Sequence, residues 1–142
     1  MSADNKPQEY NYTEERFIIA KASAARTAGD LVYLTADETG MKDAALADDT
    51  TIHLLGVAQA SIASGARGLY KIQGLCDVTV PSGNYTAGHG LKLLDGAIAS
   101  TGTTAAGIAG EASTVFAAIA TGGTSVTTCS VYLYGQKITG TT

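Results

Sequence analysis

The sequence predicts an all-β fold, and three observations support this. The 142 residues include 17 glycines but only 2 prolines and no tryptophan, and small residues suit tight turns and closely packed sheets. Apolar residues alternate with polar ones over short stretches, which is the period of a half-buried strand. Glycine-containing turns separate these stretches. The length fits a single domain.

The strands are expected in a regular order along the chain. A Pro-Ser-Gly-Asn turn is expected at residues 81–84, and Asp95-Gly96 is a hairpin signal. In the last strand, alternation should place Cys129, Val131 and Leu133 on one face. The expected strands lie at residues 30–35, within 52–60, and at 68–74, 75–80, 91–94 and 125–133.

Helix signals are few. Residues 42–49 contain Ala and Leu and favour one short helical turn, and residues 105–112 could form another, although Gly107 and Gly110 oppose it. The Gly/Thr stretches at 100–104 and 121–124 are expected to be loops. Helices should therefore contribute little to the fold.

An internal repeat relates the two halves of the chain. Residues 28–34 (AGDLVYL) match residues 87–93 (AGHGLKL), and each copy continues to a Gly-Val-Ala or Gly-Ile-Ala stretch, at 56–58 and 107–109. Each half then closes on a strand that ends in glycine, at Gly74 and Gly135. Coincidence in a chain rich in Gly and Ala is the alternative. If the repeat is genuine, two similar β-units close into one barrel or sandwich and leave no open sheet edge.

Residues 1–16 form an extended N-terminal arm in this interpretation, and residues 17–142 form the β-domain. The arm has six charged residues and no aliphatic cluster, so it cannot bury enough surface to fold alone. Tyr10, Tyr12 and Arg16 are residue types enriched at interface centres, and Phe17 would join the arm to the domain. We expect these four to contact a partner; a plain disordered tail is the alternative.

The sequence contains no recognisable catalytic, cofactor-binding or metal site. His53 and His89 have no metal-ligand partner at i+2 or i+4 spacing, and neither a P-loop nor a Gly-x-Ser-x-Gly elbow is present. Cys76 and Cys129 have no CxxC spacing and are expected to be buried free thiols, with a disulfide as the alternative. We therefore expect no enzymatic activity and no cofactor.

Charge narrows the range of partners. The net charge is −4 and the basic residues are scattered, which disfavours nucleic-acid binding. No stretch is long and apolar enough to span a membrane, and the polar N-terminus lacks a secretory signal, so folding in a cytoplasm is expected.

The C-terminal third is depleted of charge. Residues 96–142 contain only Glu111 and Lys137 as charged side chains, and charge depletion is typical of the centre of a subunit interface. We expect a homo-oligomer in which the polar-facing side of the last strand contributes to the subunit interface. Those residues are Val126, Thr128, Ser130 and Tyr132.

The order of these motifs resembles that of small phage head proteins, the capsid decoration or cement proteins of the DUF2190-like type. The resemblance covers residues 17–135. It depends on A-G-D-x-V-x-L at 28–34, G-V-A at 56–58, V-x-V-P-S-G at 78–83, A-G-x-x-L-x-L-x-D-G-x-I at 87–98 and V-x-L-x-G at 131–135.

The resemblance implies a small β-barrel or β-tulip-like domain. It also implies a trimer that binds the major capsid protein on the outer surface of the head and bridges neighbouring capsid subunits. The protein would then be part of the virion. A carbohydrate-binding or adhesion β-module is the alternative, and the low aromatic content of 6% counts against it. An enzyme subunit or lipoyl-like carrier is disfavoured because no lysine stands at an evident hairpin tip.

Overall fold

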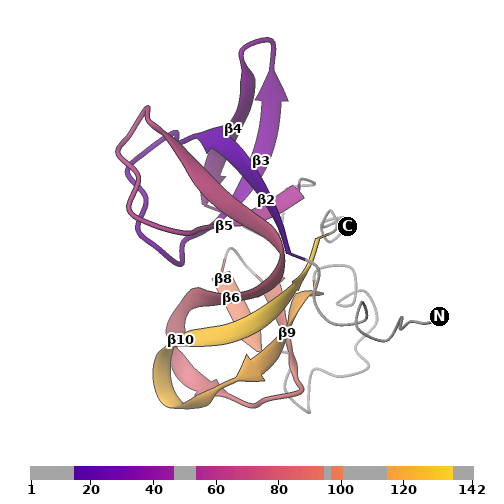
Figure 1. Ribbon diagram of the computed structural model, residues 1–142. Helices are drawn as coiled ribbons and strands as arrows, with labels where there is room; N and C mark the ends of the chain where they lie inside the picture. The colour runs from indigo at the N-terminus through magenta and orange to yellow at the C-terminus, as the bar shows by residue number, and fades with distance from the viewer. Residues whose placement is uncertain (1–14, 47–53, 95–96, 101–114, 136–142) are drawn as a thin grey trace, which may run out of the picture.

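The computed structural model describes residues 15–46, 54–94, 97–100 and 115–135 (Figure 1). Strands account for 74% of these residues and none is helical, so the all-β prediction is confirmed. The strands are β2 (Arg16–Lys21), β3 (Leu31–Asp37), β4 (Gly40–Leu46), β5 (Leu54–Ala58), β6 (Arg67–Tyr85), β7 (Gly90–Leu94), β8 (Ala97–Ser100), β9 (Val115–Thr121) and β10 (Gly123–Tyr134).

The strands form one sheet whose two parts curl on either side of a shared strand, β6. The sheet order is β2-β4-β3-β5-β6-β10-β9-β7-β8, and an additional β2–β6 pairing closes the first ring. We call β2 to β5 with residues 67–73 of β6 the first unit, and residues 75–85 of β6 with β7 to β10 the second unit. In the second unit β8 lies against β6. Figure 1 shows β6 running through both units with a pronounced curve between them.

The two units repeat the same backbone turn before β3 and before β7. Gly29 and Gly88 both have positive φ, 99° and 91°. The Gly29 N–H donates to the Ala58 carbonyl at 2.9 Å, and the Gly88 N–H donates to the Ile119 carbonyl at 2.8 Å. The units also end alike, since Gly74 and Gly135 have positive φ of 111° and 77°. The predicted repeat is therefore present in the fold.

The strand pairings correct one part of that repeat. β5 pairs antiparallel with β3, and the strand that pairs antiparallel with β7 is β9. The strand of the second unit that corresponds to the Gly-Val-Ala strand is thus Val115–Thr121. Residues 107–109, which were predicted to correspond to it, lie outside the described residues.

Three local predictions were wrong. Residues 42–46 are strand because β4 pairs with β3, and pairing in the sheet overrides the helix propensity of Ala and Leu. Residues 81–84 belong to β6; Pro81 fits there because it falls in an irregular stretch of the β6–β10 ladder, where no ladder hydrogen bond is required of it. Thr121 ends β9 and Gly123 begins β10, so only Gly122 separates them.

Each unit has its own apolar core. In the first unit β2, β3, β5 and β6 bury residues such as Ala20, Val32 and Ile72. The second core contains both cysteines and also Leu31, Leu55 and Val57 from the first unit. The second core therefore extends across the junction between the units.

The junction is closed by the Gly29 turn. The Thr79 N–H in β6 donates to the Gly29 carbonyl at 3.0 Å, and a Cβ at Gly29 would lie 2.6 Å from the Thr79 hydroxyl. Only glycine allows this approach at a positive φ. The two units are thus docked directly on each other.

A buried polar network lies inside the first unit. Asp43 in β4 has no exposed surface and accepts hydrogen bonds from Arg26 Nε at 2.9 Å, Arg26 Nη2 at 2.9 Å and the Tyr70 hydroxyl at 2.7 Å. The Ser23 N–H and hydroxyl also donate to it. Burial raises the pKa of Asp43, but the bonds from Arg26, Ser23 and Tyr70 outweigh it and hold the pKa below the ordinary value.

Candidate functional site: an outer interaction surface

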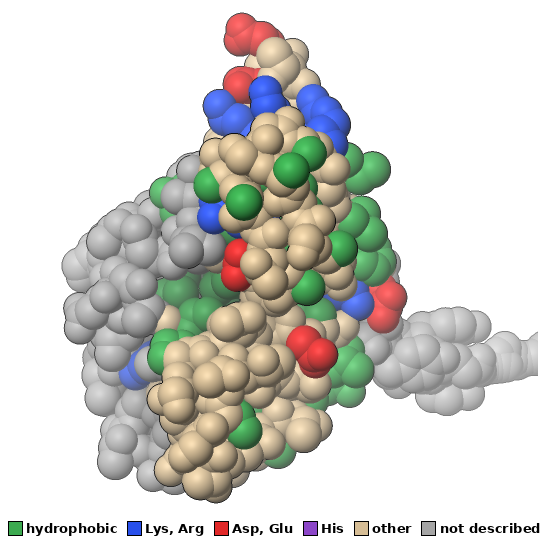
Figure 2. Space-filling model, turned by 90° about the vertical axis from the view of Figure 1, so that its left-hand side faces the viewer, with side chains coloured by type: hydrophobic (Ala, Val, Ile, Leu, Met, Phe, Trp, Pro, Cys, Tyr) green, Lys and Arg blue, Asp and Glu red, His purple; other side chains and the backbone are tan. Residues whose placement is uncertain are grey.

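The exposed hydrophobic side chains of the described residues gather on one face. Six large hydrophobic side chains in the described part of the chain are exposed, and all of them belong to β2, β6 or β10. Large exposed apolar patches mark interaction sites. We call this face the outer strip; its residues, with exposed fractions, are Phe17 (42%), Ile19 (62%), Leu69 (43%), Leu75 (41%), Tyr132 (41%) and Tyr134 (44%). Figure 2 shows hydrophobic side chains along the right-hand edge of the molecule, which is the front of the view in Figure 1.

Strand register places these residues side by side. Ile19 stands opposite Leu69 on β2 and β6, and Tyr132 stands opposite Leu75 on β10 and β6. Cross-strand neighbours on one face lie about 5 Å apart at Cβ. The strip is continuous between the units because Gln73 of β6 has Arg16 of β2 as one partner and Tyr134 of β10 as the other.

Lys71 holds the centre of the strip together. Its ammonium lies 5.1 Å from the centroid of the Phe17 ring, donates to the Leu75 carbonyl at 2.7 Å and is 3.4 Å from Glu15 Oε2. The side chain is only 8% exposed, so its methylene stem contributes apolar contact while its charge is paired. The contact fixes the start of β2 against the bend of β6.

The end of the strip in the first unit is basic. Lys21 and Arg67 are cross-strand partners and both are exposed. Arg67 also donates to the Thr39 carbonyl at 3.2 Å, and nearby Lys42 is paired with Asp37 at 2.9 Å. In Figure 2 basic side chains gather at this end of the molecule.

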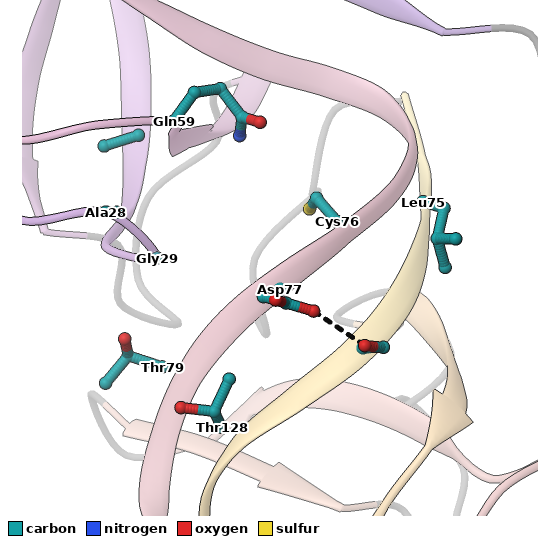
Figure 3. A pocket seen from close by; sticks show the side chains of 10 residues that line it. Ala28, Gly29, Gln59, Leu75, Cys76, Asp77, Thr79 and Thr128 are labelled. Carbon is teal, nitrogen blue, oxygen red and sulfur yellow. Dashed lines mark hydrogen bonds between the residues drawn. The ribbon is translucent and has the colours of Figure 1, made fainter.

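A polar groove of about 520 Å³ borders the strip where the two units meet (Figure 3). Asp77 accepts a hydrogen bond from the Ser130 hydroxyl at 2.6 Å, and Figure 3 shows Thr79 between β6 and the Gly29 turn. Small hydroxyls and a single carboxylate suit polar contacts with a protein surface. The groove is lined by Ala28, Gly29, Ala58, Gln59, Leu75, Cys76, Asp77, Thr79, Thr128 and Ser130.

The groove offers no activated nucleophile. Burial raises the pKa of the Cys76 thiol to about 12, and burial also raises the pKa of Cys129. Both are free and buried, as predicted, and their register partners, Val131 and Val78, place them diagonally on neighbouring strands.

Among the described residues no cluster of His, Cys, Asp and Glu could hold a metal ion. No helix in this part of the chain has the length and hydrophobicity to cross a membrane.

The structure places Thr128, Ser130 and Tyr132 on the outer side of β10, whereas Val126 lies beyond a register irregularity and packs against the second core. Thr128 and Tyr132 are exposed and Val126 and Ser130 are partly buried, whereas Cys129, Val131 and Leu133 point inward. Arg16 and Phe17, predicted as arm residues, begin β2 and are both exposed, and Phe17 belongs to the outer strip. Tyr10 and Tyr12 lie outside the described residues. Phe17 and Tyr132, which come from two separately predicted sets, thus belong to one surface, and the contacts of both sets with partners remain predictions.

The fold is shared with a phage head protein. The head fiber gp8.5 N base of bacteriophage phi29 matches with a TM-score of 0.58 and 16% sequence identity, over 87% of this chain and 98% of that chain. The resemblance to phage head proteins is therefore confirmed at the level of the fold. No protein-family model matches the chain, and neither does any curated protein sequence, so membership of the DUF2190-like group stays a prediction.

Sequence reasoning missed the β2–β6 half of the strip. Leu69 lies in a stretch predicted as a strand, but nothing in the sequence showed that it faces outward with Ile19 as its partner. The alternation of Leu69, Lys71 and Gln73 with Tyr70 and Ile72 was the available signal. It gives the two faces of the strand but not which one is solvent-exposed.

Proposed function

We propose that this chain is a structural, non-enzymatic protein of a phage head that attaches to the outer surface of the capsid and bridges capsid subunits. The observation that carries the proposal is the fold likeness, which spans nearly the whole of a phage head fiber base. An exposed apolar strip beside a groove without an activated nucleophile supports a binding role.

The attached form is a homo-oligomer, a trimer in our proposal, with the major capsid protein as its partner. Subunits associate through the outer face of β10, which has no charged residue between Gly123 and Tyr134. Charge-depleted surface with exposed tyrosine is typical of interface cores. The arm, with Tyr10, Tyr12, Arg16 and Phe17, contacts a neighbouring subunit or the capsid.

Sedimentation with phage heads tests the proposal. Heads from a phage deleted for this gene are mixed with labelled protein and separated on a gradient. We expect saturable binding, and a Thr128→Lys/Tyr132→Glu variant should bind at least tenfold more weakly, or about 1.4 kcal/mol. Thr124→Lys, at an exposed position towards the other end of β10, is the matched control. Absence of binding by the unchanged protein would refute the proposal.

A carbohydrate-binding or adhesion module is the second candidate, because Tyr132 and Tyr134 expose aromatic rings on β10. Glycan-array binding that is lost in Tyr132→Ala and Tyr134→Ala, together with no binding to heads, would favour this function instead.

A further inference from the structure

The part of the outer strip in the first unit is suited to an extended peptide. Three cross-strand pairs follow one another on its face: Lys21 with Arg67, Ile19 with Leu69, and Phe17 with Lys71. Successive pairs are two residues apart along each strand, or about 6.7 Å. The surface thus offers a basic end followed by apolar positions, at the repeat distance of one face of an extended chain.

The chain itself contains a segment of complementary chemistry. Residues 1–14 precede Glu15, which is tied to the strip through its ion pair with Lys71. Tyr10 and Tyr12 are two residues apart, so they face the same side of an extended segment, at the spacing of the strip's pairs. The segment has three acidic residues and one lysine, which complements the exposed Lys21 and Arg67.

The local sequence directs this segment away from its own strip. To lie on its own β2, the chain would have to reverse direction just before Arg16. Residues 12–16 (YTEER) contain no Gly, Pro, Asn, Asp or Ser, which are the residues that dominate turns. Fourteen extended residues reach about 46–50 Å, which is enough to cross to a neighbouring copy.

We propose that residues 1–14 of one copy pack in extended form along the outer strip of a neighbouring copy. Tyr10 and Tyr12 lie against Ile19, Leu69 and Phe17 of the neighbour, and Glu14, two residues beyond Tyr12 on the same side of the extended segment, lies towards its basic end. The inference rests on the proposed function only in assuming that the protein self-associates. It names the neighbouring subunit, and not the capsid, as the surface that the arm contacts.

Disulfide trapping between two differently tagged, co-expressed variants of the full chain tests the proposal without heads. One carries Tyr12→Cys and the other Leu69→Cys. The native thiols are buried and serve as a common background. Mild oxidation should give a heterodimer on a non-reducing gel at least fivefold above a control pair in which Thr124→Cys replaces Leu69→Cys. Mass spectrometry of the linked peptides identifies the bond.

The alternatives give distinct results. A chain carrying both Tyr12→Cys and Leu69→Cys that closes only within itself, at monomer mass, would overturn the proposal in favour of a folded-back arm. Crosslinking no higher than in the Thr124→Cys control would overturn it in favour of a capsid contact or a free tail. Heterodimer formation by a protein that does not bind heads would contradict the proposed function but leave the arm exchange standing.

Discussion

Replacing Asp43 with Asn removes the charge at the centre of the buried network and nearly preserves the shape of the side chain. Asp43 accepts hydrogen bonds from Ser23, Arg26 and Tyr70, and Arg26 is only 8% exposed. The variant leaves the Arg26 charge buried and uncompensated, which costs about 3–5 kcal/mol. At about 3 °C per kcal/mol for a domain of this size, the melting temperature should fall by about 10–15 °C.

Urea unfolding followed by circular dichroism measures this loss, and calorimetry checks the melting temperature. Asp37→Asn is the matched control, because Asp37 also forms an ion pair, with Lys42, but on the exposed hairpin; it should change the midpoint little. A loss below about 1 kcal/mol for Asp43→Asn would show that water reaches the network and would refute the argument from burial.

The second unit provides a further check. Leu34 pairs with Asp43 in the first unit, and the equivalent Leu93 pairs with Ile98 in the second. Because the same position is apolar there, an Asp43→Ile/Arg26→Met variant should recover much of the stability that Asp43→Asn loses. Failure to recover would indicate that Tyr70, left without its acceptor, carries most of the cost.

The remaining predictions concern acid, thiols, glycines and the arm. The pKa of Asp43 is lowered in the folded state. The stability that the ionised Asp43 contributes is therefore present above the unfolded pKa of about 3.9 and should be lost as the pH falls below it. An acid titration of the unfolding midpoint should show a shallower loss of stability in Asp43→Asn than in the unchanged protein. Cys76 and Cys129 should react with iodoacetamide only after denaturation. Gly88→Ala, with open space around a Cβ, should cost about 1–3 kcal/mol of backbone strain, and Gly29→Ala more because of its clash, as urea melts would show. Deleting residues 2–14 should leave the melting temperature nearly unchanged but weaken sedimentation with heads at least tenfold; equal affinity would show that the arm contributes nothing to head binding.

The sequence allowed the class of fold, the repeat and five of the nine described strands, β3, β5, β6, β7 and β10, to be predicted, because alternation and glycine-containing turns are local signals. The turns at Gly29 and Gly88 were found from seven-residue matches alone. β4 was missed because its local composition favours helix while its conformation is decided by pairing with β3. The continuity of β6 through Pro81 was missed because Pro-Ser-Gly-Asn favours a turn locally. A register irregularity in the pairing with β10 accommodates the proline within the strand.

The candidate surface was predicted only in part. Val126, Thr128, Ser130 and Tyr132 were assigned to one face of β10 by period two alone; this holds for Thr128, Ser130 and Tyr132 but is wrong for Val126, because a register irregularity breaks the alternation and Val126 packs against the second core. Which sheet face meets solvent depends on how the rings close, and that is a long-range property. The Ile19–Leu69 pair could therefore not be predicted from either stretch of sequence.

The sharing of β6 has a consequence for how such a protein could grow. The boundary between units falls within a strand, at Gly74, and not in a linker. β10 occupies the position in the second unit that residues 67–73 of β6 occupy in the first unit, and both stretches end at a glycine of positive φ. β6 continues beyond Gly74 and thereby enters the second unit. If β10 were lengthened beyond Gly135 in the same way, it would supply the first strand of a third unit. A further unit could thus be added without a linker, because the strand that ends one unit also begins the next.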